Sequence, residues 1–293
     1  MSRNHGRVTP NEEEVLEQEP PAAPIQYMDS PPVADDAGFN WTNPTYFVDV
    51  PSKGKFYPPG HPMHNRDTIE IKYMTAKEED ILSSESLLRK GVAIDRLLES
   101  VIVDKSIAVQ DLLLGDKNAL MIGTRITGYG ENYKVNVSCP KCSQEGDYEF
   151  DLERIGTNDY EQKITELGCE FTKNNTVLVK LPLSKVEVEI RLLNGHDDKK
   201  LTEQANQKVR KNLPDSRLTD QLRAFIVSIN GIDSPFAIAN FVNHMPARDS
   251  KFLRDLYIDI APNIDLTQEY DCPKCGHVAD LEVPLNSGFF WPQ

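Results

Sequence analysis

Alternation of apolar and polar side chains marks the candidate β-strands of this chain. The clearest example is Ile69-Glu70-Ile71-Lys72-Tyr73, whose period of two predicts a half-buried strand. Residues 176–180 and 186–191 alternate on either side of the turn-forming stretch Leu181–Lys185, which predicts a β-hairpin. Further strands are expected at 46–50, 133–137 and 278–283.

Apolar side chains at helical spacing predict helices between these strands. Thr75 and Glu78 have the spacing of a capping box, Gly91 suits a helix end, and Asp116 is expected to cap the helix that follows it. Asn230-Gly231 predicts a turn between two helices. The helices are expected at 76–90, 92–103, 117–127, 197–212, 219–229, 235–243 and 247–259. Their apolar stripes should face a core: Leu87, Leu88, Ile94, Leu97, Leu98, Val101 and Ile102 in one part, and Leu222, Phe225, Ile226 and Ile229 in another.

The sequence Cys-Pro-Lys-Cys occurs twice, at 139–142 and at 272–275. Each copy is a Cys-x-x-Cys knuckle, and two knuckles supply the four thiolates that tetrahedral structural zinc prefers. The flanks repeat at equal offsets: Asp147, Glu149 and Leu152 after the first copy, and Asp280, Glu282 and Leu285 after the second. Residues 143–271 lie between the knuckles. A zinc site at Cys139, Cys142, Cys272 and Cys275 would therefore hold the two ends of a large insertion together.

Two other interpretations of the cysteines stay open, namely two disulfides or a thioredoxin-like redox motif. The redox motif belongs at a strand-to-helix junction, whereas both knuckles lie between predicted strands. Lys141 and Lys274 place positive charge beside the sulfurs, which favours thiolates. His277 is expected to be a solvated loop residue, because four sulfurs complete the shell, and Cys169 a small buried side chain.

Together these elements predict an α+β chain with small β elements and helical clusters. The two knuckles join into a zinc-ribbon-like module that carries a large inserted α+β subdomain. We expect four regions: an acidic, Pro-rich disordered tail at 1–38, an α+β region with the first knuckle at 39–153, the inserted hairpin and helices at 154–265, and the second knuckle, closing strand and aromatic C-terminus at 266–293.

Composition narrows the function classes. The 293 residues carry a formal net charge of −14, which disfavours a general nucleic-acid-binding role. No apolar run has the length of a membrane span, and no signal peptide is recognised. Cysteines at metal-type spacing, without a disulfide framework, suit the reducing cytosol.

The first 38 residues hold eight acidic residues, two basic residues and six prolines. Few apolar side chains are present to offset the entropy of ordering, so this tail is expected to be disordered. Its charge run Glu12-Glu13-Glu14 is expected to be solvated. Ile25, Tyr27 and Met28 are the alternative, a short docking motif.

Catalytic motifs are scarce. Gly123, Gly128 and Gly130 follow a helical run and do not form a phosphate-binding loop, which needs a strand before it. Asp197-Asp198 suits a helix start better than a carboxylate pair for acid–base chemistry. The histidines are scattered and are assigned no role.

Several segments together resemble the T-even-type bacteriophage baseplate proteins. Val50-Pro51-Ser52-Lys53-Gly54-Lys55-Phe56-Tyr57 is similar to the opening Leu/Val-Pro-Ser-basic-Gly-x-x-Tyr of that family. The segments Tyr73–Leu82, Lys90–Asp95, Asp116–Asn118 and Arg125–Gly130 continue the resemblance, which is best over residues 46–151.

The resemblance implies a small structural or assembly protein of a contractile tail, associated with the central hub of the baseplate. It implies no enzymatic activity, and its partners would be other tail and baseplate hub proteins, with no nucleic acid and no membrane span. The protein would be present in the host cytoplasm during assembly and in the virion if it stays in the finished baseplate. Two other function classes stay open. A nucleic-acid-binding zinc ribbon would need basic residues around the knuckles, where acidic residues dominate, and a zinc-dependent enzyme would need an exchangeable ligand.

Two aromatic segments are candidate contact surfaces for such partners. Phe56 and Tyr57 lie in a loop rich in Pro and Gly, and Phe289-Phe290-Trp291 lie near the C-terminus. Buried aromatic anchors dominate many interfaces. The alternative is that each segment folds back onto its own domain.

Overall fold

The computed structural model describes residues 42–285 and 288–290. Its first sheet is the antiparallel pair β1 (Thr45–Asp49) and β2 (Thr68–Lys72), in which Val48 lies opposite Ile69. Both strands were expected from their alternation. The inward-facing residues Val48, Ile69 and Ile71 are buried against the helices that follow.

The first helices are α1 (Ala76–Ser83), α2 (Glu85–Lys90) and α3 (Ala93–Val101). One helix was expected over 76–90, and this is wrong because the extended backbone of Ser84 ends α1 before α2 begins. The capping box at Thr75 and Glu78 is confirmed. Burial would raise the pKa of Glu78, but hydrogen bonds from the Ser100 hydroxyl and from Thr75 outweigh it and lower the pKa to about 2.

A short 3₁₀ helix, η1 (Val109–Asp111), precedes the long helix α4 (Leu114–Tyr129). We had expected Asp116 to cap this helix, and this is wrong, because Asp116 lies buried inside the first turn. Its carboxylate accepts hydrogen bonds from the Ser52 N–H (3.0 Å), the Ser52 hydroxyl (2.6 Å) and the Tyr57 hydroxyl (2.7 Å). The preceding loop therefore uses the oxygens that a cap would have used.

The loop between β1 and β2 is part of the core. Phe56 and Tyr57 are 7% and 2% exposed, so the expectation that they face outward is wrong. The Tyr57 hydroxyl bonds Asp116 and also accepts the Leu113 N–H at 2.9 Å, which holds the ring inside. Gly54 has φ +70°, and a Cβ there would lie 2.4 Å from the Arg66 nitrogen, so the turn needs glycine.

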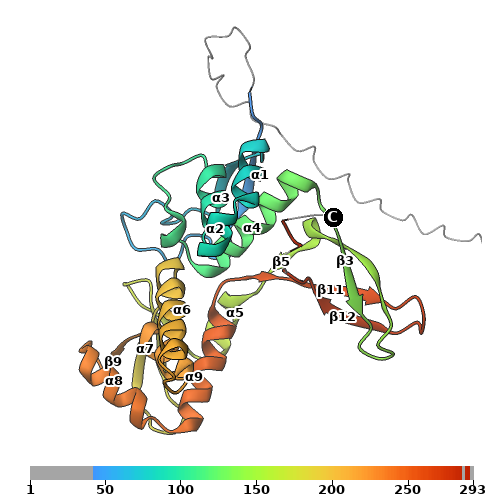
Figure 1. The fold of residues 1–293 in the computed structure, drawn as a ribbon. Helices are drawn as coiled ribbons and strands as arrows, with labels where there is room; N and C mark the ends of the chain where they lie inside the picture. The colour runs from blue at the N-terminus through green and yellow to red at the C-terminus, as the bar shows by residue number, and fades with distance from the viewer. Residues whose placement is uncertain (1–41, 286–287, 291–293) are drawn as a thin grey trace, which may run out of the picture.

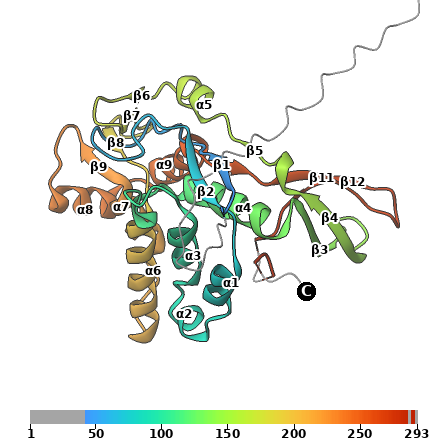
Figure 2. The ribbon, with the colours of Figure 1, turned by 90° about the horizontal axis from the view of Figure 1, so that it is seen from above.

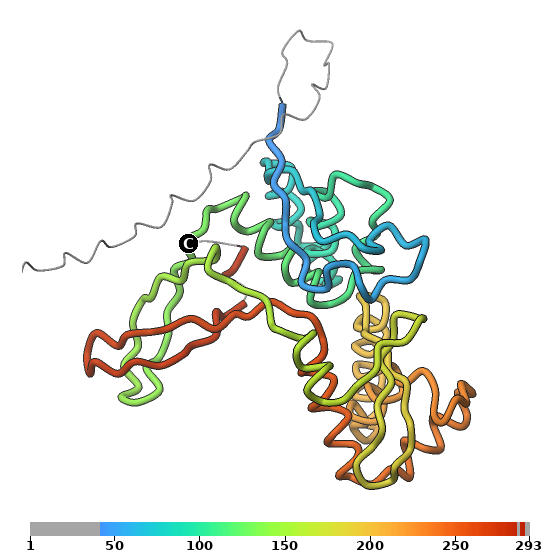
Figure 3. The backbone as a smooth tube through the Cα atoms, turned by 180° about the vertical axis from the view of Figure 1, so that it is seen from behind, coloured from blue at the N-terminus to red at the C-terminus, as the bar shows by residue number. Residues whose placement is uncertain are grey.

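Two β-hairpins lie side by side, although more than one hundred residues separate them in sequence (Figures 1 and 3). The first pairs β3 (Asn132–Ser138) with β4 (Glu145–Asp151), and the second pairs β11 (Thr267–Asp271) with β12 (Val278–Glu282). They are joined where the Gln268 side chain bonds the Asp151 backbone twice, at 3.2 Å and 2.7 Å.

The insertion between the hairpins begins with η2 (Leu152–Arg154), β5 (Gly156–Thr157) and α5 (Tyr160–Glu166). Its sheet has the order β6-β7-β8-β9, from β6 (Glu170–Phe171), β7 (Val177–Lys180), β8 (Glu187–Ile190) and β9 (Ile226–Ile229). Its helices are α6 (Gly195–Arg210), α7 (Arg217–Phe225), α8 (Pro235–His244) and α9 (Ala247–Ile260). The hairpin of β7 and β8 was expected from the alternation.

The helix expected over 219–229 ends early. It stops at Phe225, and Ile226–Ile229 forms β9, which pairs with β8. This segment is rich in β-branched residues, which favour strands over helices. Pairing with the edge of β8 supplies the hydrogen-bond partners for its backbone. Asn230 and Gly231, both at positive φ, consequently make a turn between a strand and a helix.

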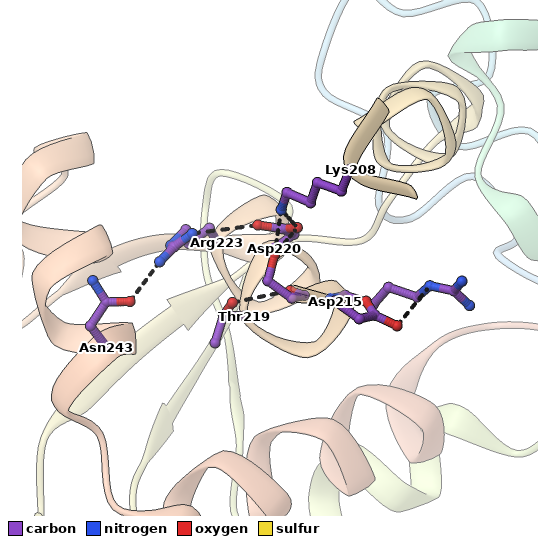
Figure 4. A network of polar contacts seen from close by, with 8 residues as sticks. Lys208, Asp215, Thr219, Asp220, Arg223 and Asn243 are labelled. Carbon is purple, nitrogen blue, oxygen red and sulfur yellow. Dashed lines mark hydrogen bonds and ion pairs between the residues drawn. The ribbon is translucent and has the colours of Figure 1, made fainter. Parts of the chain in front are cut away.

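A polar network ties three helices of the insertion together (Figure 4). Lys208 on α6 forms a short ion pair with Asp220 on α7. Arg223, one turn further along α7, contacts Asp220 at 3.4 Å and donates to the Asn243 side chain on α8 at 2.6 Å. Asp220 therefore links α6 to α7, and Arg223 links α7 to α8.

The insertion leaves and rejoins the rest of the chain through a short antiparallel pair of β5 and β10 (Ile264–Asp265). Asn158 and Asn263 continue this pair with a backbone bond of 3.0 Å and a side-chain bond of 2.9 Å. Gly115 of α4 packs directly against the same crossing, since a Cβ there would lie 1.9 Å from the Pro262 carbonyl oxygen. The two ends of the insertion are therefore joined by protein contacts as well as by the knuckles.

The C-terminal segment folds back, contrary to its expected role as a free contact surface. Phe289 and Phe290 are 1% and 2% exposed, and the Phe289 ring packs edge-on against Tyr133 at a centroid distance of 5.1 Å. Burying these two rings removes apolar surface from water, which favours the folded-back arrangement. Trp291 lies outside the described residues.

The α+β fold class is confirmed, with helices and small antiparallel sheets. None of the helices in the described part of the chain is both long and apolar enough to cross a membrane. The disordered tail expected at 1–38 falls outside the described residues. The four proposed regional boundaries stay a prediction.

Candidate metal centre

Both knuckles form the same turn at the tip of a hairpin. In the first, the Cys139 N–H donates to the Gln144 carbonyl and the Ser143 N–H donates to the Cys139 carbonyl, both at 2.9 Å. In the second, the Cys272 N–H donates to the His277 carbonyl at 3.0 Å and the Gly276 N–H to the Cys272 carbonyl at 2.9 Å.

The backbone conformations of the two turns also agree. The residue directly after each second cysteine has a positive φ, 53° at Ser143 and 62° at Gly276. The repeated sequence therefore produces two turns with the same hydrogen bonds and the same backbone conformation. The sequence repeat is therefore also a structural repeat.

The structure brings the four predicted sulfurs together. The Sγ atoms of Cys139, Cys142, Cys272 and Cys275 all lie within 4.8 Å of one another. Two distances that cross between the knuckles, Cys139 to Cys275 and Cys142 to Cys272, are both 3.8 Å. A tetrahedron with metal–sulfur bonds of roughly 2.3 Å has sulfur–sulfur edges of about 3.8 Å. A disulfide has a sulfur–sulfur distance of only about 2.05 Å.

A small cluster of buried side chains packs beside the sulfurs, on the side of the hairpin strands. Cys139 and Cys272 are buried together with Tyr270, and the residues packed around them come from both hairpins. The rings of Tyr148 and Tyr270 meet edge-to-face at 5.0 Å, and the Tyr148 hydroxyl donates to the Glu269 carbonyl at 2.8 Å. The hairpins are thus oriented by ring packing independently of the sulfurs.

Burial raises the pKa of the Cys275 thiol to about 12, whereas the surroundings of Cys272 favour its thiolate. Backbone N–H groups at Cys275 and Lys274 lower the pKa of the Cys272 thiol to about 6. The Lys274 ammonium donates to the Gln144 side chain at 2.8 Å, which places its charge between the two knuckles. A thiol ionised near neutral pH is a good ligand for a soft metal.

The donor set fits a closed site. Among residues 42–285 and 288–290, the group of candidate metal-binding side chains contains only the four cysteines. His277 is half-buried and contributes its carbonyl to the turn. Cys169 lies elsewhere and is half-buried, where we had expected it to be fully buried. Four sulfurs this close together could hold one metal ion, and the two distances of 3.8 Å fit the edges of a tetrahedral site.

Sequence reasoning missed the side chains that support the site. Tyr148 and Leu281 follow the last cysteine of their knuckles at the same offset, and both pack against the buried cluster. Val137 and Tyr270 are matched in the same way before the first cysteines. The matched positions in the two flanks could therefore have identified these supporting side chains from the sequence. No matched position identified Gln268, which joins the hairpins.

Comparison with known proteins places the chain in a family. The family model described as T4 bacteriophage base plate protein matches residues 43–291, a range that includes the insertion and the second knuckle. No curated protein and no solved structure gives a match. The resemblance seen over 46–151 thus extends across most of the sequence, and the chain belongs to the T4 bacteriophage base plate protein family.

Proposed function

We propose that this chain is a structural or assembly component of the central hub of a contractile-tail baseplate, with a structural zinc ion bound by Cys139, Cys142, Cys272 and Cys275. Family membership makes it a phage baseplate protein whose partners are other tail components. The hub position, the zinc ion and a role during assembly in the host cytoplasm are the proposed refinements. The convergence of four thiols from two distant knuckles is the observation that supports the zinc.

Zinc in this position would cross-link the two hairpins. The metal would fix one hairpin tip against the other, where Tyr148 and Tyr270 already pack beside the sulfurs, while Gln268 joins the hairpin bases. A rigid two-hairpin arm projecting from the helical body presents a defined surface to a neighbour (Figure 1). Structural zinc sites contribute directly to the folding free energy of small modules of this kind.

Protein contacts, not catalysis, are the proposed mode of action. Four sulfur ligands leave no position for an exchangeable water or a substrate. Large apolar side chains are exposed on the insertion, with Phe236 at 83%, Ile258 at 71% and Val209 at 67%. Such residues are the kind that interfaces bury, so they replace the loop and C-terminal rings as the candidate contacts.

The first experiment is elemental analysis of freshly purified, reduced protein, with one zinc ion per chain as the expected result. Cys272→Ser should lower the zinc content, while the matched control Cys169→Ser should keep it. A metal-free wild-type protein would contradict the zinc site. Loss of zinc in the control as well would contradict the ligand assignment.

The second experiment tests the place of action. Mass spectrometry of purified mature particles should detect the chain, and Phe236→Ser should reduce its incorporation without changing its fold or zinc content. The inward-facing Ile238→Val serves as a control with little effect on incorporation. A chain that binds hub precursors but is absent from mature particles would be an assembly factor only, and one that binds no tail protein would refute the proposal.

A further inference from the structure

Helix α6 is poorly covered by the rest of the protein. It spans sixteen residues, yet Gly195 at its start is its one buried residue. Helices of this length normally bury an apolar stripe, because tertiary packing supplies most of their stability. Thr202, Ala205 and Val209 share one face of α6, and Val209 is 67% exposed. This face of α6 is therefore incompletely covered by the part of the chain that the structure describes.

The uncovered face borders a groove of about 360 Å³ between α6 and α7. Thr202, Ala205 and Asn206 line it from α6, and Arg217 and Gln221 line it from α7. Small side chains at Thr202 and Ala205 keep this groove shallow and open to an apolar group from outside.

The turn after α6 exposes further apolar surface. The Leu213 N–H donates to the Lys208 carbonyl at 2.9 Å, and the Asn212 N–H donates to the Val209 carbonyl at 3.1 Å, with Asn212 at φ 50°. In such a Schellman motif, the residue at the position of Leu213 commonly packs against the one at the position of Lys208. Here the Lys208 side chain is drawn to Asp220 instead (Figure 4), and Leu213 stays 54% exposed.

Basic side chains lie beside this apolar surface. Arg210 and Lys211 are exposed at the end of α6, and neither pairs with a carboxylate within residues 42–285 and 288–290. Leu218, which is 54% exposed, follows in the first turn of α7. We call this surface the α6–α7 tip, and it consists of Val209, Arg210, Lys211, Leu213 and Leu218.

The outward face of the β11–β12 hairpin has the complementary character. Glu269 lies directly opposite Asp280, and Asp271 lies opposite Val278. All four side chains are exposed, Val278 at 53%. Like charges directly opposite each other destabilise an antiparallel pair, and no ion pair with these carboxylates is present among the described residues.

The β3–β4 hairpin lacks this unbalanced arrangement. Glu149 lies opposite Lys134 and pairs with it at 3.3 Å, and Asp147 lies opposite Asn136, which donates to it at 3.3 Å. The acidic residues at the matched positions of β12 face Glu269 and a threonine instead. A partner that supplies cations to the β11–β12 face would relieve its repulsion.

We propose that the α6–α7 tip of one molecule docks on the outward face of the β11–β12 hairpin of a second copy. Val278 supplies the apolar contact for Val209 and Leu213, and the carboxylates of that face meet Arg210 and Lys211. Charges more than about 8 Å apart are largely screened at physiological ionic strength, so these local contacts matter more than the net charge of −14.

The positions of the two surfaces require contact between molecules. Figures 1 and 2 place α6 and the hairpin arm at opposite ends of the protein. A second copy covers both surfaces with one kind of interface, and each molecule keeps one tip or one hairpin face for the next. Head-to-tail contacts of this type build rings where the rotation closes and open arrays where it does not. This inference stands without the zinc ion and without the hub position.

Sedimentation velocity on the full chain measures the association. Wild-type protein should associate as its concentration rises, and its association constant should fall by about tenfold or more between about 0.05 and 0.5 M salt, because salt screens the ion pairs. A wild-type chain that stays monomeric at low salt throughout the dilution series would overturn the proposal.

Charge reversal identifies the two surfaces. Arg210→Glu with Lys211→Glu on the tip should weaken the association by about tenfold or more, and so should Glu269→Lys with Asp280→Lys on the hairpin. Mixed in equal amounts, the two variants should associate again, because the unaltered tip of one meets the unaltered hairpin of the other. If the mixture stays monomeric while both variants keep the wild-type circular dichroism spectrum, the head-to-tail contact is wrong.

The matched control makes the same charge change on the other hairpin. Glu145→Lys with Asp147→Lys should leave the association unchanged, and an equal loss there would refute a specific contact at β11–β12. A photoreactive benzoylphenylalanine in place of Leu213 should cross-link to residues 267–282 of another molecule, as judged from a mixture of isotope-labelled and unlabelled protein. Cross-links confined to other segments would refute the assigned surface.

Discussion

Removing one of the proposed zinc ligands should let the two hairpin tips separate while the helices of the protein stay folded. In Cys272→Ser the site would lose a sulfur that is 2% exposed and shares a small cluster with Cys139 and Tyr270. Structural zinc supplies roughly 10–16 kcal/mol in small zinc-binding peptides. One buried large side chain supplies only about 1.5–3 kcal/mol, and an isolated hairpin is marginal in water.

The main core does not depend on the metal to the same degree. The ends of the insertion are joined by β5, β10 and the Asn158–Asn263 contacts, and the hairpin bases by Gln268 and the Phe289 ring. We therefore expect local opening rather than global unfolding. Amides in residues 135–148 and 268–281 should exchange at least about a hundredfold faster, while the amides of α4 and α9 keep their protection.

Hydrogen–deuterium exchange with mass spectrometry on both proteins checks this, with Cys169→Ser as the matched control. The same pattern should follow when a chelator removes the metal from the wild-type chain. If Cys272→Ser exchanged like wild type at both tips, the sulfurs would not be what holds the hairpin tips together. If it lost protection everywhere in one transition, the independent closure of the insertion would be wrong.

Three further outcomes concern the helical body and can be measured by denaturant unfolding. Tyr57→Phe should destabilise the chain by about 1–3 kcal/mol, because it removes one of the three hydrogen bonds to the buried Asp116 carboxylate and takes away the acceptor of the Leu113 N–H; an unchanged midpoint would show that the hydroxyl is dispensable. Glu78→Gln should cost stability at pH 7, and the difference from wild type should shrink as the pH falls from about 4.3 toward 2, because the folded-state pKa lies below the unfolded one; a gap that persists at pH 2 would contradict the sign. Gly115→Ala should cost about 3 kcal/mol through its clash with the crossing segment, while Gly146→Ala, which meets nothing within 4 Å, should be nearly neutral.

The repeated knuckle was readable from sequence because its chemistry is local. Residue type, spacing and matching flanks are all properties of short segments, and they predicted that Cys139 and Cys272 would meet across the insertion. The strands β1, β2, β7 and β8 were readable for the same reason, since alternation records which face is buried. The family resemblance, carried by short motifs, was also visible in the sequence and is confirmed by the match over residues 43–291.

Contacts between distant segments were not readable. Asp116 was expected to cap its own helix, yet its partners Ser52 and Tyr57 come from a loop far earlier in the chain. The same long-range bonds draw a Pro- and Gly-rich loop inward, which local composition would place in solvent. Ile226–Ile229 has helical spacing in sequence, and only the open edge of β8 makes it a strand.

The sequence by itself therefore determined the types of local structure, the family and the four candidate ligands. Only the tertiary structure decided which polar groups found partners and which segments paired as strands. The physical reason is that apolar periodicity reports burial of a segment without naming what buries it. A hydrogen bond between Tyr57 and Asp116, or the pairing of Ile226–Ile229 with β8, exists only after separate elements have packed against one another.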